Sequence, residues 1–282
     1  ISKARSSFWA GKSAEISGDT NAAKLWYSRA AAFPSTFYGQ LAIKKNDQQF
    51  FIPDTKQNIS EEEIKIFYEK PLIKALIILN QANHKKLFKS FSRQVIKDLE
   101  NTKDTILLIN FLNNINKTSL AIYAGRKAIY KNIYLPSLNF PLPENKLLET
   151  YKKNSYIPIN VALAITRQES AFDISAVSRA GARGLMQLMP RTARITAKKI
   201  NHKYIRKNLT TIPSYNIKLG TFYFKQMLNK FNGSYVLALA SYNAGPNRVK
   251  RWLKIYGDPR KNEIDQVTWI ELIPISETRN YV

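Results

Sequence analysis

Apolar residues recur at every third or fourth position along most of the chain, which is the spacing that lines one face of an α-helix. No segment shows a comparably strong alternation of apolar and polar positions, the pattern of a half-buried strand. The pattern therefore predicts an all-α protein, built as an array of helices with short connections. In the first half of the chain it predicts a hairpin over residues 8–42 and further helices over residues 58–70, 70–81, 84–100, 103–114 and 117–132.

Residues that cap helices predict several of the boundaries. Gly18 suits the end of the first hairpin helix, and Asp19 or Thr20 can cap the next one. Ser60, which is followed by three glutamates, predicts a helix start, and Pro71 predicts another. Small residues and aromatic residues recur where the two hairpin helices would meet, in a pattern that resembles a tetratricopeptide repeat unit. Because one such unit cannot bury its own face, we expect further repeats upstream of this sequence.

A proline-rich stretch, IYLPSLNFPLPEN, interrupts the helical pattern with Pro136, Pro141 and Pro143. We place a boundary there and expect a helical region over 1–140 and a second, mostly helical domain over 141–282. The sequence does not start with Met, shows no signal peptide and has no apolar run long enough to span a membrane. It ends inside an unfinished pattern. We therefore expect a processed or trimmed piece of a longer soluble protein, truncated at its C-terminus.

The chain carries 44 Lys and Arg against 20 Asp and Glu, and this formal charge of +24 favours polyanionic partners. Nucleic acid, an anionic membrane and cell-wall peptidoglycan are the classes that fit, and a compositional bias towards Lys, Asn and Ile is the alternative explanation. The chain has no cysteine, and its two histidines, His84 and His202, are far apart. These counts exclude disulfides and thiolate metal sites and argue against a histidine-based metal centre or triad. We expect no metal and no cofactor.

One carboxylate interrupts the apolar face of the helix predicted from Asn160 onwards. At 100° per residue, Glu169 lies about 20° from Ala162 and about 40° from Ile165. It lies about 60° from Phe172. Burial disfavours an ionised carboxylate and raises its pKa, and a Glu that stays protonated near neutral pH can act as a general acid. The structural alternative is a Glu at the edge of the core, bonded to an arginine or to a helix N-terminus.

Three longer motifs carry more information than this helix alone. They are ESAFDISAVSRAGARGLMQLMP, which begins at Glu169, then ALASYNAGPNRVKRWL, then WIELIPISETRNYV. In their order and spacing they resemble the soluble lytic transglycosylases, lysozyme-like enzymes that cleave peptidoglycan. The resemblance covers most of residues 144–282, and the segment from WAGKSAE to STFYGQLA is similar to the helical superhelix of the large members. It implies a helical superhelix followed by a lysozyme-like, all-α catalytic domain.

Several residues match functional positions of that family. Glu169 matches the single catalytic acid, and Tyr242 matches a tyrosine whose hydroxyl lies beside the acid. Ser178 matches a hydroxyl that hydrogen-bonds near the acid. The resemblance implies a substrate-binding role for Ser178, Gln187, Met189, Tyr242, Asn243 and Glu277.

Each of these residues also has a structural alternative. Ser178 could cap a turn, and Asn243 could form one. Met189 could be an ordinary core residue. Glu277 could pair with Arg279 or with another basic residue instead of contacting substrate.

The distribution of acidic residues bears on the mechanism independently of the family. From Ile174 to Gly257 the chain has no Asp or Glu. Ordinary glycosidases need two carboxylates flanking the scissile bond. Asp173, close to Glu169, is better explained as a cap or turn residue. The acid-free stretch favours a mechanism with one carboxylate, although a second one in space could still come from Asp258, Glu263, Asp265, Glu271 or Glu277.

The resemblance implies such a mechanism. Glu169 would protonate the glycosidic oxygen between N-acetylmuramic acid and N-acetylglucosamine. The ionised Glu169 would then take the proton of the muramic C6 hydroxyl, which attacks C1 and closes a 1,6-anhydro ring without water. Peptidoglycan strands are the expected partner, in the periplasm of a Gram-negative cell after removal of a signal peptide that this sequence lacks. No nucleic acid is expected, and no protein partner can be named.

Three other functions stay open. A hydrolytic muramidase of the lysozyme type would use one of the later acids as its second carboxylate. A basic helical module could bind nucleic acid, although the chain has no recognised nucleic-acid motif and its basic residues are spread over both halves. A wall-binding protein without activity is the third, and the presence of Glu169, Gln187 and Tyr242 in one chain argues against it.

Overall fold

The computed structural model describes residues 2–49, 57–131 and 133–282, apart from the side chain of Ser2. Within these ranges the chain is helical and has only isolated β-bridges, so the all-α prediction is confirmed. None of the helices in these ranges is long and apolar enough to cross a membrane. The chain divides into two compact units, Ile1–Pro141 and Leu142–Val282.

The first unit begins with a group of three helices that pack on one another. The first of them ends before Gly18, and the Asp19 side chain caps the second by accepting a backbone N–H at 2.9 Å, as predicted. The ring of Phe8 lies 5.5 Å from that of Tyr27 and 5.4 Å from that of Tyr38, so aromatic contacts hold the three helices together. These helices are α1 (Ser2–Ile16), α2 (Thr20–Ala31) and α3 (Phe37–Lys45).

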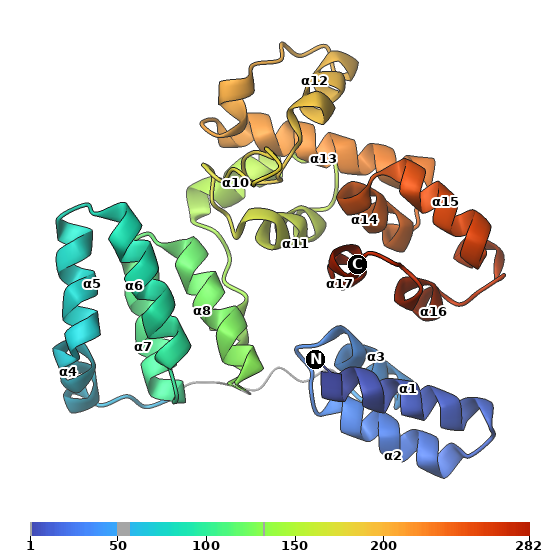
Figure 1. Cartoon of the computed structure of the whole chain (residues 1–282), viewed down its shortest axis with the longest axis horizontal. Coiled ribbons are helices and arrows are strands. Elements are labelled where there is room, and N and C mark those ends of the chain that lie inside the picture. The colour runs from blue at the N-terminus through green and yellow to red at the C-terminus, as the bar shows by residue number, and fades with distance from the viewer. Residues whose placement is uncertain (1, 50–56, 132) are drawn as a thin grey trace. The chain divides into compact units, whose positions relative to one another are not determined.

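The rest of the first unit forms a second helical group around one buried helix, α7. Its Leu108, Ile109 and Leu112 have no exposed surface. Figure 1 shows α5 to α8 as neighbouring, roughly upright helices, and α6 contacts both α5 and α8. The helices of this group are α4 (Glu61–Glu69), α5 (Pro71–Gln81), α6 (Lys85–Asp98), α7 (Thr102–Asn114), α8 (Thr118–Tyr130) and α9 (Pro136–Asn139).

The short helix α9 lies within the proline-rich stretch that the sequence predicted as a linker. Its buried Asn139 explains why this stretch is ordered. The Asn139 side chain accepts the Leu135 N–H at 2.6 Å and donates to the Gly125 carbonyl of α8 at 2.9 Å. The last residue of the predicted helix 117–132, Asn132, lies outside the described residues.

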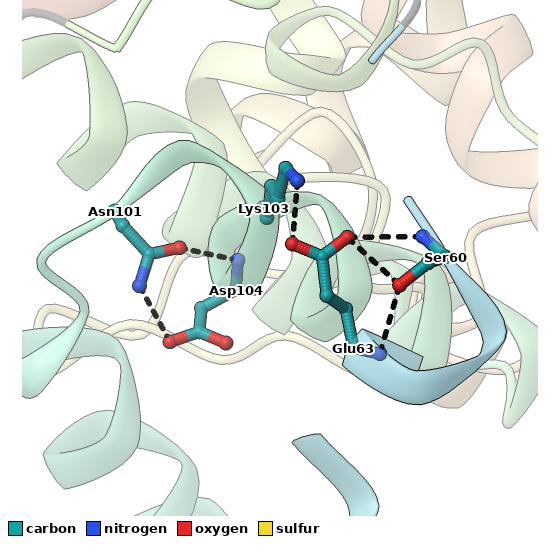
Figure 2. A network of polar contacts seen from close by, with 5 residues as sticks. All are labelled: Ser60, Glu63, Asn101, Lys103 and Asp104. Atoms are coloured by element: carbon teal, nitrogen blue, oxygen red, sulfur yellow. Dashed lines mark hydrogen bonds and ion pairs between the residues drawn. The ribbon is translucent and has the colours of Figure 1, made fainter. Parts of the chain in front are cut away.

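Polar side chains fix the start of α4, as Figure 2 shows. The Ser60 N–H donates to the Glu63 carboxylate at 2.9 Å, and the Glu63 N–H donates back to the Ser60 hydroxyl at 3.2 Å, which forms a capping box. The ammonium of Lys103, on α7, pairs with the same carboxylate. Asn101 caps α7 by accepting the Asp104 N–H at 2.8 Å. Each helix start is therefore fixed by its own cap, and the ion pair between Glu63 and Lys103 joins α4 to α7.

The second unit is built around the longest helix, α13, which contacts α10, α12 and α14 (Figure 1). Gly245, with φ of +89°, joins α14 to the helix that starts at Pro246. Trp252 and Trp269 anchor a core cluster near the end of the chain. The elements are α10 (Asn145–Asn154), α11 (Ile159–Ser170), α12 (Pro190–Lys199), the 3₁₀ turn η1 (Arg206–Leu209), α13 (Pro213–Lys230), α14 (Tyr235–Ala244), α15 (Pro246–Tyr256), the 3₁₀ turn η2 (Pro259–Lys261), α16 (Gln266–Glu271) and α17 (Ser276–Tyr281).

Candidate active site

Glu169 lies in the last turn of α11, on the face that carries the buried Ala162 and Ile165. The helix ends one residue later, because Ala171 and Phe172 both adopt left-handed conformations with φ of +50° and +63°. Helical periodicity predicted that Phe172 lies on the helix, and this prediction is wrong. The side chain of Phe172 is nevertheless buried beyond the helix end. The carboxyl group therefore lies where the helix stops and the chain turns away.

The surroundings of Glu169 favour its protonated form. The side chain is partly buried, and this burial raises its pKa to about 7. The Tyr281 hydroxyl donates to Glu169 Oε1 at 2.7 Å and lowers the pKa, while the negative charge of Glu277 raises it. The C-terminal end of a helix also disfavours a negative charge. In the described part of the chain, no lysine or arginine forms an ion pair with this carboxylate.

The hydrogen bond to Glu169 comes from a tyrosine that the sequence analysis did not select. The hydroxyl of Tyr242, which we expected to hold the acid, donates instead to the Met186 carbonyl at 2.7 Å. Burial and the charge of Glu169 both raise the pKa of Tyr242, so its ring lies near the acid. Tyr281, in the last turn of α17, makes the contact itself. Its pKa is also raised, first by burial and then by Glu169.

Ser178 and Gln187 stabilise the loop between α11 and α12. The Ser178 hydroxyl accepts the Ala182 N–H at 3.0 Å, so it caps a turn, which is the structural alternative considered for it. Gln187 has a φ of +44°, and its side-chain amide donates to the carbonyls of Gly184 at 2.8 Å and Ala176 at 3.2 Å. The amide oxygen of Gln187 stays available as an acceptor. The loop is thus held by its own polar groups.

Three further residues fix this loop against the helices. The Ser170 hydroxyl, next to Glu169, donates to the Leu185 carbonyl at 2.8 Å. The buried Asn216 of α13 accepts the Met186 N–H at 2.8 Å. A Cβ at Gly184 would lie 1.9 Å from a carbonyl oxygen, so only glycine fits there. The sequence offered a signal for Ser170, in its Glu-Ser pair, but none for Asn216.

The remaining predicted site residues lie at the surface or at the junction of α14 with α17. Asn243 accepts a hydrogen bond from the Thr278 hydroxyl at 2.6 Å, which ties the two helices together. Glu277 is exposed, and Arg279 donates to two backbone carbonyls at 3.2 and 3.3 Å instead of pairing with it. Met189 is 43% exposed, so it is not an ordinary core residue. Glu277 and Tyr281 thus approach Glu169 from one short helix, α17.

The described residues contain no group of three or more His, Cys, Asp or Glu side chains that could hold a metal ion. The Tyr281 phenol donates a hydrogen bond to Glu169, and the carboxylate of Glu277 is close enough to raise the pKa of Glu169. This arrangement can give and take a proton near neutral pH.

Comparisons with known proteins show what the part of the chain that carries this site is similar to. The family model of the transglycosylase SLT domain matches residues 146–264. The soluble lytic murein transglycosylase of Escherichia coli K12 is 41% identical over 144 residues, which are 51% of this chain and 22% of that protein. Residues 146–264 thus resemble the soluble lytic transglycosylases. A putative soluble lytic murein transglycosylase of Haemophilus influenzae, another relative, is 38% identical over 146 residues, which are 52% of this chain and 24% of that protein.

Solved structures of the family match both units of the chain. The 70 kDa soluble lytic transglycosylase of Escherichia coli has a TM-score of 0.77 and 27% identity, with 99% of this chain and 44% of that chain covered. An inactive Glu-to-Gln mutant of the lytic transglycosylase Slt of Pseudomonas aeruginosa has a TM-score of 0.82, with the same identity and coverage. The chain thus spans less than half the length of these structures and about a fifth of the curated Escherichia coli relative.

Proposed function

We propose that this protein is a lytic transglycosylase that cleaves murein between N-acetylmuramic acid and N-acetylglucosamine and leaves 1,6-anhydro ends. The environment of Glu169 carries the proposal, because burial raises the pKa of this carboxyl to about 7. A carboxyl that is about half protonated near neutral pH can serve first as an acid and then as a base. The substrate class follows from the names of the relatives, which are murein transglycosylases.

The proposed reaction has two proton transfers at one carboxyl group. Protonated Glu169 donates its proton to the glycosidic oxygen while positive charge develops at C1 of the muramic residue. The ionised Glu169 then removes the proton of the C6 hydroxyl of the same sugar, and the C6 oxygen bonds to C1. The hydrogen bond from Tyr281 favours the ionised form and so stabilises Glu169 between the two steps. An intramolecular nucleophile is already close to C1, so no second carboxylate has to activate water.

Glu277 supports a second candidate, a hydrolytic muramidase. Its charge lies close enough to raise the pKa of Glu169. It is exposed, and none of the carboxylate ion pairs in the described part of the chain involves it, so it could act as a base toward water. The acid-free stretch from Ile174 to Gly257 leaves few other choices. We favour the transglycosylase because the relatives carry that name.

The ends of the released muropeptides decide between the two reactions. We expect 1,6-anhydro-muramic acid termini that resist borohydride reduction and take up no label from water enriched in heavy oxygen. Purified sacculi serve as substrate, and mass spectrometry identifies the ends. Reducible, labelled termini would assign the chain to the hydrolases and give Glu277 the role of second carboxylate.

We also propose the periplasm of a Gram-negative cell as the place of action. Murein lies there, and the relatives named above come from Escherichia coli and Haemophilus influenzae. The substrate is an anionic polymer, and a chain with a formal charge of +24 is suited to bind one. The expected partner is therefore the glycan strand itself.

A further inference from the structure

A groove of about 910 Å³ lies on the first unit, between side chains of α6 and α8. The two helices contact each other directly. No acidic side chain lines this groove, and six of its eleven lining residues are basic. The basic residues are Lys86, Lys89, Arg93 and Lys97 on α6, together with Lys127 on α8 and Lys131 just after it.

The positive charges of α6 share one face of the helix. Lys89, Arg93 and Lys97 follow one another at intervals of four residues, which places like charges side by side. Like charges at this spacing destabilise a helix slightly, so folding alone does not favour the arrangement. The acidic residue of α6 itself, Asp98, accepts hydrogen bonds from the Gln94 amide at 2.9 Å on both carboxylate oxygens.

Carboxylates neutralise other lysines of this unit but not those of the groove. Lys70 pairs with Asp104 and Lys103 pairs with Glu63. In the described part of the chain, none of the basic residues that line the groove forms an ion pair with a carboxylate. Lys131 donates to the backbone carbonyls of Lys97, at 2.7 Å, and of Leu99 instead. The groove therefore keeps a local excess of positive charge.

The makeup of the groove suits anionic groups on a flexible polymer. Five of its six basic groups are lysines, which are mobile point charges that can follow such groups, and the proposed substrate supplies carboxylates. Lys127 Nζ lies 5.6 Å from the ring centre of Tyr123 and 5.9 Å from that of Tyr130. Tyr130 is 66% exposed, so an apolar ring surface lies beside the charges. Such a surface can contact the apolar parts of a peptide or sugar.

We propose that this basic groove binds murein through the carboxylates of its peptide stems, as an attachment site in a different unit from Glu169. The inference rests on the proposed function, which supplies a carboxylate-rich polymer as the substrate. A strand held at one site is presented to a second site at a high effective concentration, so attachment increases the chance of cleavage. The contacts are exposed ion pairs, and salt therefore weakens them.

The test uses the full chain with Glu169→Gln, so that sacculi are bound without being cut. In this background, Lys86, Lys89 and Lys127 are changed together to Gln, and binding is measured by co-sedimentation at low salt. We expect the apparent affinity to fall about tenfold, as the loss of three exposed ion pairs implies. The control changes Lys3, Lys24 and Lys65 to Gln; these are exposed lysines of the same unit that do not line the groove. It removes the same charge, and we expect less than a twofold effect.

Modified substrates test the chemistry of recognition. The parent should lose about tenfold in affinity for sacculi whose stem carboxylates have been amidated, and the groove variant should bind native and amidated sacculi equally. An equal loss of affinity in the groove and control variants would overturn the proposal. So would a groove-dependent affinity that is higher for single-stranded DNA or for anionic phospholipid vesicles than for sacculi. Reducible product ends would refute the proposed function but leave these binding results unaffected.

Discussion

Glu63 in the first unit and Glu169 in the second are two glutamates with opposite surroundings. Glu63 lies in the first turn of α4, where the helix dipole favours its charge, and it contacts Ser60 and Lys103 (Figure 2). Its hydrogen bonds to Lys103 and Ser60 lower its pKa. Glu169 lies in the last turn of α11, partly buried, and a neutral phenol is its hydrogen-bond partner. Burial raises its pKa to about 7.

The comparison separates a carboxylate that stabilises the fold from one that is suited to move a proton. Glu63 satisfies a helix N-terminus and a lysine, and both contacts favour its ionised form. In the described part of the chain, Glu169 forms no ion pair with a lysine or an arginine, and the negative charge of Glu277 disfavours the ionised form of Glu169. A fold gains nothing from an ionised carboxylate in such a position. Its presence there is best explained by chemistry.

The largest expected effect comes from removing the carboxylate of Glu169. Glu169→Gln keeps the shape of the side chain and removes its proton, so turnover of sacculi should fall by about a thousandfold or more. Binding of sacculi should stay nearly intact. Glu63→Gln is the matched control: Gln can still complete the capping box, and turnover should stay within twofold of the parent. The release of soluble muropeptides from sacculi measures the turnover of both variants. If Glu169→Gln retained activity within a few-fold of the parent, Glu169 would not be the acid.

Tyr281→Phe should have the next largest effect. It removes the hydrogen bond that favours ionised Glu169, so the pKa of Glu169 rises and the ionised intermediate is less stable. We expect the rate to fall by about 10- to 100-fold and the alkaline limb of the pH profile to move to higher pH.

Tyr242→Phe is the matched comparison for Tyr281→Phe. It removes the hydrogen bond to the Met186 carbonyl and leaves the hydrogen bond from Tyr281 to Glu169 in place, so the alkaline limb of the pH profile should stay where it is in the parent. Our sequence-based expectation gave the holding role to Tyr242, whose variant would then lower the rate more than the affinity. A limb that moved with Tyr242→Phe and not with Tyr281→Phe would restore that role.

The roles of Tyr242 and Tyr281 show which features of the site could be predicted from the sequence and which could not. Helix starts at Ser60 and Pro71 were predicted correctly, because a cap depends on neighbours within four residues. The inward position of Glu169 followed from helical periodicity. The hydrogen bond from Tyr281 to Glu169 joins residues that are 112 positions apart in the sequence. A pattern of neighbouring residues cannot predict a contact between residues so far apart.

The loop residues show the same limit. Ser178 and Gln187 were expected at the substrate groove, but their side-chain hydrogen bonds join residues of the loop itself. Asn216 fixes that loop from α13, and an isolated Asn in a helix gives no sequence signal. The end of α11 at Ser170 was also not predicted, because Ala171 adopts a left-handed conformation that is uncommon for residues other than glycine.

Stability should also respond to the carboxyl group of Glu169, in a pH-dependent way. The pKa in the folded state is about 7 and the ordinary value is 4.5, so the unfolded chain loses its proton first as pH rises. The folded state therefore loses stability relative to the unfolded state from about pH 4.5 to pH 7, and the loss is constant above. Glu169→Gln should raise the free energy of unfolding by about 3 kcal/mol at pH 8 and leave it unchanged at pH 4. Denaturant unfolding at both pH values measures this, and an equal difference at both would contradict burial as the cause.

The smallest expected effect, that of Glu277→Gln, bears most directly on the choice of mechanism. Removal of an exposed negative charge near Glu169 lowers the pKa of Glu169, so the alkaline limb should move down by less than about one pH unit. Activity near pH 7 should then fall only a few-fold, and the products should keep their anhydro ends. The shift should shrink as salt is added, because an exposed charge is screened, whereas the Tyr281→Phe shift should persist. A hydrolase would behave differently, because a water molecule would lose its base and activity would be abolished at every pH. Complete loss together with labelled, reducible ends in the parent would therefore assign Glu277 as a second catalytic carboxylate, and Glu169 would no longer act alone.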